Sequence, residues 1–233
     1  GFQIVGAKQS RSRTVDAREH AKHVVYLSHP EILDKAQMIV GEERPMLALT
    51  NSHNGTSALA FDTALFRLVC SNGLLMPSSA VNSARVVHKI GMQGEVIDAA
   101  YKVVASMPAQ VALVSSLKGI QLNQDEKMLL ATSAARMAFE ESELELNRSV
   151  GNAIEDKLLR PRRHADVGDD LWTTFNVIQE NIIKGGLRVV RENEETKRRT
   201  IAKTRAVGSI DRDAKLNREL MALATGLAQL KTA

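Results

Sequence analysis

The segment from Pro45 to Val69 constrains the fold most strongly. It reads PMLALTNSHNGTSALAFDTALFRLV, with Asn54-Gly55 between two arms in which apolar residues alternate. Asn-Gly is a strong hairpin signal, because a type I′ turn needs a positive φ at both of its central residues. The segment therefore predicts two antiparallel strands joined by a tight turn.

The first third of the chain, residues 1–75, is β-rich in character. FQIVGAK (2–8) and AKHVVYL (21–27) are short runs with β-branched residues, separated by a polar stretch, and they predict two further strands. HPEILDKAQMIV (29–40) has apolar residues at helical spacing and predicts a short helix.

From Val81 onward the apolar spacing becomes that of helices. Segments 94–107, 124–141, 170–185 and 210–230 predict helices. We expect Asn123 and Ser209 to cap the second and the last of them, and Gly185-Gly186 to end the third. The last helix carries a leucine stripe that suits either a core or a subunit interface: Leu216, Leu220, Leu223, Leu227 and Leu230.

Together these segments predict an α+β fold. N-terminal antiparallel strands with a β-hairpin precede helices, a basic hairpin or strand, and a long C-terminal helix. We predict a single domain over 1–233 that is β-rich over 1–75 and mainly helical over 81–186. The basic strand and the closing helix then occupy 187–233.

Thr196–Val207, TKRRTIAKTRAV, carries cations at the period of a strand. Lys197, Arg199, Lys203 and Arg205 are predicted to share one face. Between residues 184 and 205 there are eight Lys or Arg against three Glu, a net of +5, whereas the whole chain carries +4. The basicity is therefore local, as in surfaces that bind a phosphate backbone. The alternative is a solvated hairpin whose cations keep an exposed edge from pairing with other chains.

A second basic cluster, KLLRPRR (157–163), lies in a charged segment, 152–170, that we predict to be a loop. It contains Arg162 and Arg163, and it suits either contact with a nucleic-acid strand or a solubilising loop. A third, weaker group consists of Arg11, Arg13 and Arg18. Two other cations close to the strand, Arg188 and Arg191, join the candidate residues.

Motifs for catalysis are missing from the sequence. It has no phosphate loop, no dinucleotide-binding glycine motif and no H-E-x-x-H, so we expect no cofactor, no metal and no enzyme, and an enzyme that acts on DNA stays open as a third alternative. The single cysteine, Cys70, lies in an apolar run and is interpreted as a core thiol in a reducing compartment. No apolar run approaches the roughly 18 residues of a membrane helix.

Several stretches resemble one family, a group of uncharacterised phage- and plasmid-borne proteins catalogued as a domain of unknown function. The hairpin motif T-N-S-H-(D/N)-G carries most of the resemblance, and segments 170–186 and 204–220 extend it. The matching hairpin residues are Thr50, Asn51, Ser52, His53, Asn54, Gly55, Ser57 and Ala58, followed by Arg67, Val69, Cys70 and Asn72. For Asn51, Ser52 and His53, both a binding role and a structural role stay open. The resemblance implies mobile DNA in a bacterial cytoplasm. The outline is also similar to ring-forming single-strand annealing proteins.

We therefore expect an oligomeric protein of a phage or plasmid that binds single-stranded DNA and promotes annealing in recombination. Aromatic residues make up 3% of the chain, which disfavours binding by base stacking and suits contacts to the phosphate backbone. The candidate DNA-binding residues are Lys197, Arg199, Lys203, Arg205, Arg162, Arg163, Arg188 and Arg191. The alternative is an oligomeric structural or host-defence-interacting protein whose basic face meets a protein partner.

Overall fold

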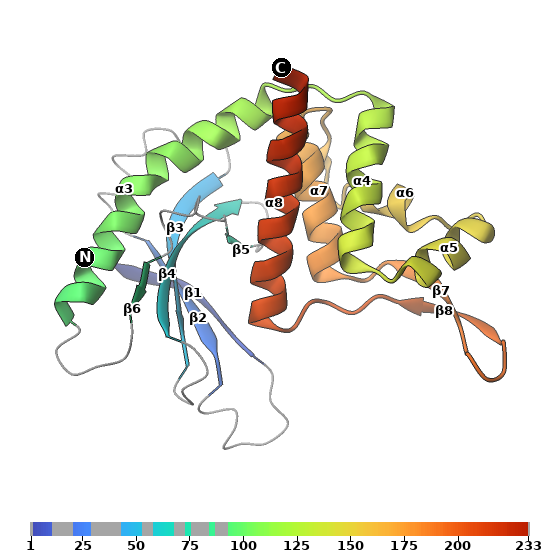
Figure 1. Ribbon diagram of the computed structural model, residues 1–233, viewed down its shortest axis with the longest axis horizontal. Coiled ribbons are helices and arrows are strands. Elements are labelled where there is room, and N and C mark those ends of the chain that lie inside the picture. The colour runs from blue at the N-terminus through green and yellow to red at the C-terminus, as the bar shows by residue number, and fades with distance from the viewer. Residues whose placement is uncertain are drawn as a thin grey trace. The chain divides into compact units, whose positions relative to one another are not determined.

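The computed structural model describes residues 2–10, 21–28, 43–52, 58–67, 73–75, 84–86 and 93–232 (Figure 1). The chain forms two compact units, which we describe separately. Unit 1 comprises Gly1–Ser115 and Gly208–Arg218, and unit 2 comprises Ser116–Val207 and Glu219–Ala233. The predicted α+β class is confirmed, and the single-domain organisation stays a prediction.

Unit 1 contains an antiparallel sheet in the order β1-β2-β3-β4-β5, with β6 also pairing with β4. Its strands are β1 (Gln3–Gln9), β2 (His23–Ser28), β3 (Glu43–Asn51), β4 (Leu59–Arg67), β5 (Gly73–Leu75) and β6 (Ala84–Val86). The strands predicted at 2–8 and 21–27 and the two hairpin arms are confirmed. The short strand β6 also extends the sheet into the segment 81–186, which is predicted to be mainly helical.

The pairing of β3 with β4 is shifted by one residue from the pairing that a two-residue turn at Asn54-Gly55 would produce. Such a turn would place Thr50 opposite Leu59, but Thr50 pairs with Ala60. The described arms are therefore symmetric about Gly55. Residues 53–57 themselves lie outside the described residues, as do the helix predicted at 29–40, the group Arg11, Arg13 and Arg18, and Cys70.

Both faces of the sheet are covered within unit 1. Successive side chains of a strand point to opposite faces, so Leu47 and its neighbours on β3 enter different cores. Leu47 packs with Phe61 against Val103 of α3 (Gln93–Lys118). On the other face, Met46 and Ala48 pack with Ile210, the first residue of α8 (Ile210–Thr232). An ion pair between Lys22 and Asp211, 2.6 Å long, also joins the start of α8 to this unit.

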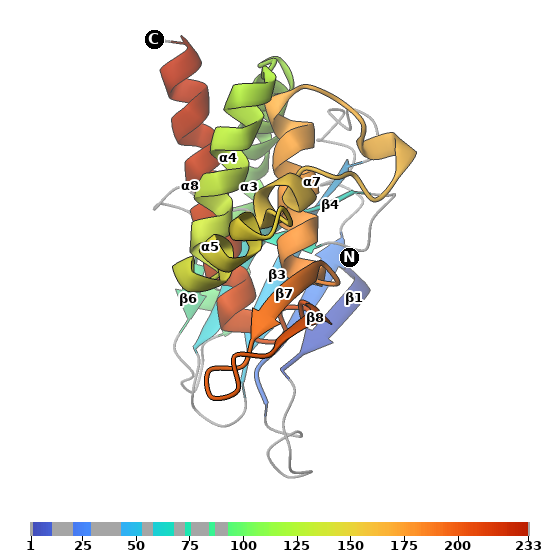
Figure 2. The ribbon, with the colours of Figure 1, turned by 90° about the vertical axis from the view of Figure 1, so that its right-hand side faces the viewer.

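Unit 2 consists of short helices around the buried helix α7, together with a two-stranded hairpin (Figures 1 and 2). Its elements are α4 (Gln124–Ala138), α5 (Glu141–Ser149), α6 (Ile154–Leu158), the 3-10 helix η1 (His164–Asp166), α7 (Leu171–Lys184), β7 (Arg188–Glu192) and β8 (Arg199–Lys203), with residues 219–232 of α8. Trp172 and Phe175 of α7 are buried and stacked in the core of unit 2, with ring centroids 5.4 Å apart.

The predicted helix ends are confirmed by their hydrogen bonds. The side chain of Asn123 accepts from the backbone N–H of Glu126 at 2.9 Å, and the Glu126 carboxylate accepts from the backbone N–H of Asn123, which forms a capping box. The Ser209 hydroxyl accepts from the backbone N–H of Arg212 at 3.3 Å. At the end of α7, Gly185 has a φ of 62°, a value that favours glycine.

The loop predicted over 152–170 is wrong in part, because this segment contains α6 and η1. Leu158 and Ile154 of α6 are fully buried. The apolar residues of this charged segment are too few to show helical periodicity, so the sequence pattern does not predict the helix. The segment is nevertheless fixed to the core of unit 2.

Candidate nucleic-acid interface

The predicted basic strand is shorter than the cationic segment that predicted it. β8 begins at Arg199 and ends at Lys203, and it pairs with β7 so that Arg188 lies opposite Lys203 (Figure 2). Arg199, Ile201 and Lys203 alternate along the strand and are exposed, as expected for one face. The prediction that four cations line one strand is wrong for Lys197 and Arg205. Lys197 lies in the turn, with a φ of 54°, and Arg205 lies beyond the end of β8.

Carboxylates pair with several of the predicted DNA-binding cations. Glu192 accepts from Arg199 at 2.9 Å and lies 4.0 Å from Lys197, while Arg191 lies 3.5 Å from Glu143. These pairs are exposed enough that each is worth about 1 kcal/mol or less. Each carboxylate nevertheless offsets positive charge beside it, so these cations contribute less to an anion-binding surface.

Arg163 has a structural position. It pairs with Asp166 at 3.2 Å and also with Glu180, which is buried and accepts from Lys184 at 2.8 Å. Burial alone would raise the pKa of Glu180, but the hydrogen bonds from Lys184 and Arg163 outweigh it and hold the pKa below its usual value. Glu180 therefore stays ionised at neutral pH, and the charge of Arg163 is neutralised inside unit 2.

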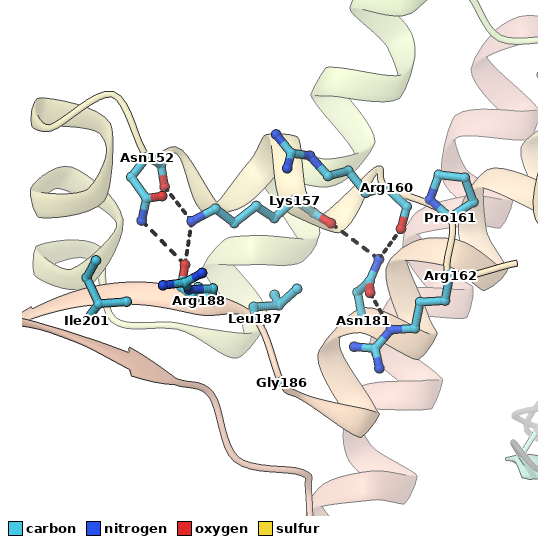
Figure 3. Close-up of a pocket in the computed structure, with 10 residues that line it drawn as sticks. All are labelled: Asn152, Lys157, Arg160, Pro161, Arg162, Asn181, Gly186, Leu187, Arg188 and Ile201. Carbon is cyan, nitrogen blue, oxygen red and sulfur yellow. Dashed lines mark hydrogen bonds between the residues drawn. The ribbon is translucent and has the colours of Figure 1, made fainter.

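Four other cations line one cavity of about 660 Å³ in unit 2 (Figure 3). We call it the basic cavity, and its cations are Lys157, Arg160, Arg162 and Arg188. The other lining residues are Asn152, Pro161, Asn181, Gly186, Leu187 and Ile201, so no carboxylate lines the cavity. The fold thus joins the cluster at 157–163 to the first residue of β7. Lys203 and Arg205, both exposed, have no acidic partner in the described part of the chain.

Lys157 connects the two segments directly. Its ammonium donates to the backbone carbonyl of Asn152 at 3.1 Å and to that of Arg188 (Figure 3). Desolvation by burial, followed by repulsion from Arg160 and Arg188, lowers the pKa of Lys157. The charge of Asp156 opposes this shift in part, and an anion that binds among the cations relieves the remaining repulsion.

Asn181 of α7 fixes the backbone that carries Arg160 and Arg162. Its amide donates to the carbonyls of Leu158 and Arg160, each at 3.0 Å, and to that of Lys157 at 3.3 Å. Its side-chain oxygen accepts from Nε of Arg162 at 2.7 Å, and Arg162 also donates to the carbonyl of Gly185. Asn181 was not predicted from the sequence, because one buried amide in an apolar helix leaves no periodic signal.

Two predicted residues lie in a different cavity. Arg191 and Lys197 line a space of about 390 Å³ together with four glutamates, Glu140, Glu143, Glu192 and Glu194. Of the eight candidate cations, the structure therefore brings Arg162 and Arg188 together in the basic cavity and places Arg191 and Lys197 among carboxylates.

The family hairpin motif contributes three described residues in unit 1: Thr50, Asn51 and Ser52. Ser52 is 3% exposed, and its backbone N–H donates to the side-chain oxygen of Asn51 at 2.8 Å. This local bond is typical of a turn residue that satisfies its own backbone. His53, Asn54 and Gly55 lie outside the described residues.

The described residues show neither a metal site nor a membrane span. Within them, no group of three or more His, Cys, Asp or Glu side chains could hold a metal ion. None of the helices found there is long and apolar enough to cross a membrane.

Comparison with known proteins identifies the family. Residues 1–221 match the family described as "Domain of unknown function (DUF932)". The chain is 37% identical over 227 residues to the UPF0380 protein YafZ of Escherichia coli (strain K12), covering 97% of this chain and 76% of the relative. It is also 37% identical over 232 residues to the UPF0380 protein YfjQ of the same organism, covering 99% and 78%. No solved structure matches the chain. The resemblance to a family catalogued as a domain of unknown function is thus confirmed, and the chain belongs to the DUF932 family.

Proposed function

We propose that this protein binds single-stranded DNA through the phosphate backbone, with the basic cavity and the neighbouring exposed cations of unit 2 as the contact surface. One observation carries the proposal: Lys157, Arg160, Arg162 and Arg188, from two separate segments, line one cavity that no carboxylate lines. Each phosphate that such a cation neutralises releases condensed counterions, which favours binding. The protein acts as an oligomer in the bacterial cytoplasm and holds strands for annealing.

Within unit 2, the positions of the aromatic residues support contact with the backbone, whereas the exposed aromatic residues Phe2 and Tyr101 belong to unit 1. Trp172 and Phe175 of unit 2 are buried against each other, and no aromatic residue lines the basic cavity. Binding by base stacking needs exposed aromatic surfaces. Phosphate contacts leave the base edges free, and annealing requires free base edges because each strand must find its complement.

A pair of matched double variants tests this surface. Arg160 and Arg188 are exposed, and their side chains make no hydrogen bond or ion pair with a described residue, so Arg160→Gln with Arg188→Gln should leave the fold intact. We expect this variant to make the slope of log Kobs against log salt shallower by about 1.4, at about 0.7 per phosphate contact. Affinity at low salt should fall roughly tenfold or more.

The control removes the same charge from the same unit. Arg191→Gln with Lys197→Gln takes two cations from among carboxylates. We expect this control to change the slope by less than about 0.5. Equal changes in the two double variants would contradict the assignment of DNA binding to the basic cavity. If Arg160→Gln with Arg188→Gln abolished binding to an acidic protein but left DNA binding unchanged, the result would favour the protein-partner alternative.

A further inference from the structure

We infer that the basic cavity binds a phosphate monoester, the terminal phosphate of a DNA strand. This inference rests on the proposed function and adds a preference for strand ends. The cavity combines a cationic lining with an apolar one: its four cations occur together with Pro161, Leu187 and Ile201. A strand end has the matching chemistry, because a charged phosphate is attached to a deoxyribose ring whose C–H groups can pack on these apolar side chains.

The count of free donors exceeds what one internal phosphate can use. Arg160 and Arg188 have guanidinium groups without a hydrogen-bond partner among the described residues. Arg162 already donates hydrogen bonds within the protein from Nε and from one terminal nitrogen. Lys157 already donates from two of its three N–H groups. The remaining N–H groups suit an acceptor with several charged oxygens.

A terminal phosphate offers that acceptor better than an internal one. A phosphate monoester carries a charge of about −1.5 to −2 and three strong acceptor oxygens. An internal phosphodiester carries a single charge and two free oxygens, and its chain must continue on both sides. Four cations without a carboxylate in the lining therefore match the dianion more closely, since guanidinium groups bind phosphate oxygens through paired hydrogen bonds.

The backbone of the lining is held in place before any ligand binds. Asn181 fixes the backbone at Leu158 and Arg160 through hydrogen bonds, and Asn152 donates to the carbonyl of Arg188 at 3.4 Å. Gly186 adds no side chain to the lining, and nothing lies within 4 Å of the position that a Cβ would take there. The backbone of the lining and the donor groups of Lys157 and Arg162 therefore lose little freedom on binding, whereas the guanidinium groups of Arg160 and Arg188 become ordered by the ligand.

The test compares one labelled oligonucleotide of about 16 nucleotides with three kinds of end: 5′-phosphate, 3′-phosphate and hydroxyl at both. At an ionic strength of about 0.15 M, the wild-type chain should bind one phosphorylated form about tenfold more tightly than the hydroxyl form. The Arg160→Gln, Arg188→Gln variant should lose this preference, and the Arg191→Gln, Lys197→Gln control should keep it.

The outcomes separate the inference from the proposed function. Equal affinity for all three forms would overturn the strand-end inference and leave DNA binding standing. A preference that survives Arg160→Gln with Arg188→Gln would also overturn it, because the monoester would then bind elsewhere. If a nucleoside monophosphate competed for the site as strongly as the phosphorylated oligonucleotide does, the site would be one for free nucleotides. That result would overturn the inference that the ligand is a strand end. Failure to bind any oligonucleotide would overturn both proposals.

Discussion

Replacing Asn181 with Leu is expected to lower the free energy of unfolding of unit 2 by about 3–5 kcal/mol. Asn181 is 2% exposed, and its amide donates to the carbonyls of Lys157, Leu158 and Arg160. Leucine has a similar volume but no donor, so the carbonyls of Leu158 and Arg160 lose their side-chain partner, whereas that of Lys157 still accepts from the backbone N–H of Arg160 at 3.2 Å. The guanidinium of Arg162 also loses its acceptor at 2.7 Å. Each buried polar group left without a partner costs about 1–3 kcal/mol.

Asn176 provides a matched control on the same helix. It is 8% exposed, and its amide donates at 2.7 Å to the carbonyl of Trp172, one turn earlier in α7. Because that carbonyl is within a helix, we expect Asn176→Leu to cost about 1 kcal/mol or less. Urea denaturation followed by tryptophan fluorescence measures both variants, since Trp172 is the only tryptophan and is buried in unit 2. Equal costs for the two variants would contradict the role assigned to Asn181.

Gly185→Ala is expected to destabilise unit 2 by about 3 kcal/mol or more. Gly185 has φ 62° and ψ −148°, a region that residues other than glycine adopt only with strain of about 1–3 kcal/mol. A Cβ there would also lie 2.6 Å from the carbonyl carbon and oxygen of Arg205. That backbone cannot move freely, because Thr204 accepts from the backbone N–H of Gly186 at 2.8 Å and donates to the carbonyl of Leu187 at 2.9 Å.

An alanine at the neighbouring glycine, Gly186, distinguishes the cost of backbone strain from the cost of a steric clash. Gly186 has a φ of 82°, but nothing lies within 4 Å of the position that the methyl group of an alanine would occupy. Gly186→Ala should therefore cost only the backbone strain, about 1–2 kcal/mol. The same urea denaturation compares the two. A Gly185→Ala variant as stable as Gly186→Ala would show that the close approach of Arg205 is not a constraint.

Local signals made much of the fold predictable. Asn123 and Ser209 mark helix starts, Gly185 marks a helix end, and the alternating arms around Asn54-Gly55 form β3 and β4, because these features depend on residues within a few positions of one another. The strand β8 was predicted too long because the turn before it was not recognised. The side chain of Asn193 accepts from the backbone N–H groups of Glu195 and Thr196, a turn that Asn typically forms.

The candidate site was less predictable, because it depends on contacts between distant segments. Both halves of the basic cavity were identified as basic sequence, but they are joined by long-range bonds, such as those from Lys157 and Asn152 to the carbonyl of Arg188. Arg163 was a candidate equal to Arg162 by sequence, yet it pairs with Glu180 in the interior. Charge patterning along a chain cannot distinguish these two neighbours, since their partners lie on α7.

The most direct test of the central claim is fluorescence anisotropy of the wild-type chain with a labelled, hydroxyl-ended single-stranded oligonucleotide, titrated across salt concentrations. We predict saturable binding whose log Kobs falls with log salt at a slope of about −3, from about 0.7 for each of the four cavity cations. No binding at low salt would contradict the claim that the basic cavity meets a phosphate backbone.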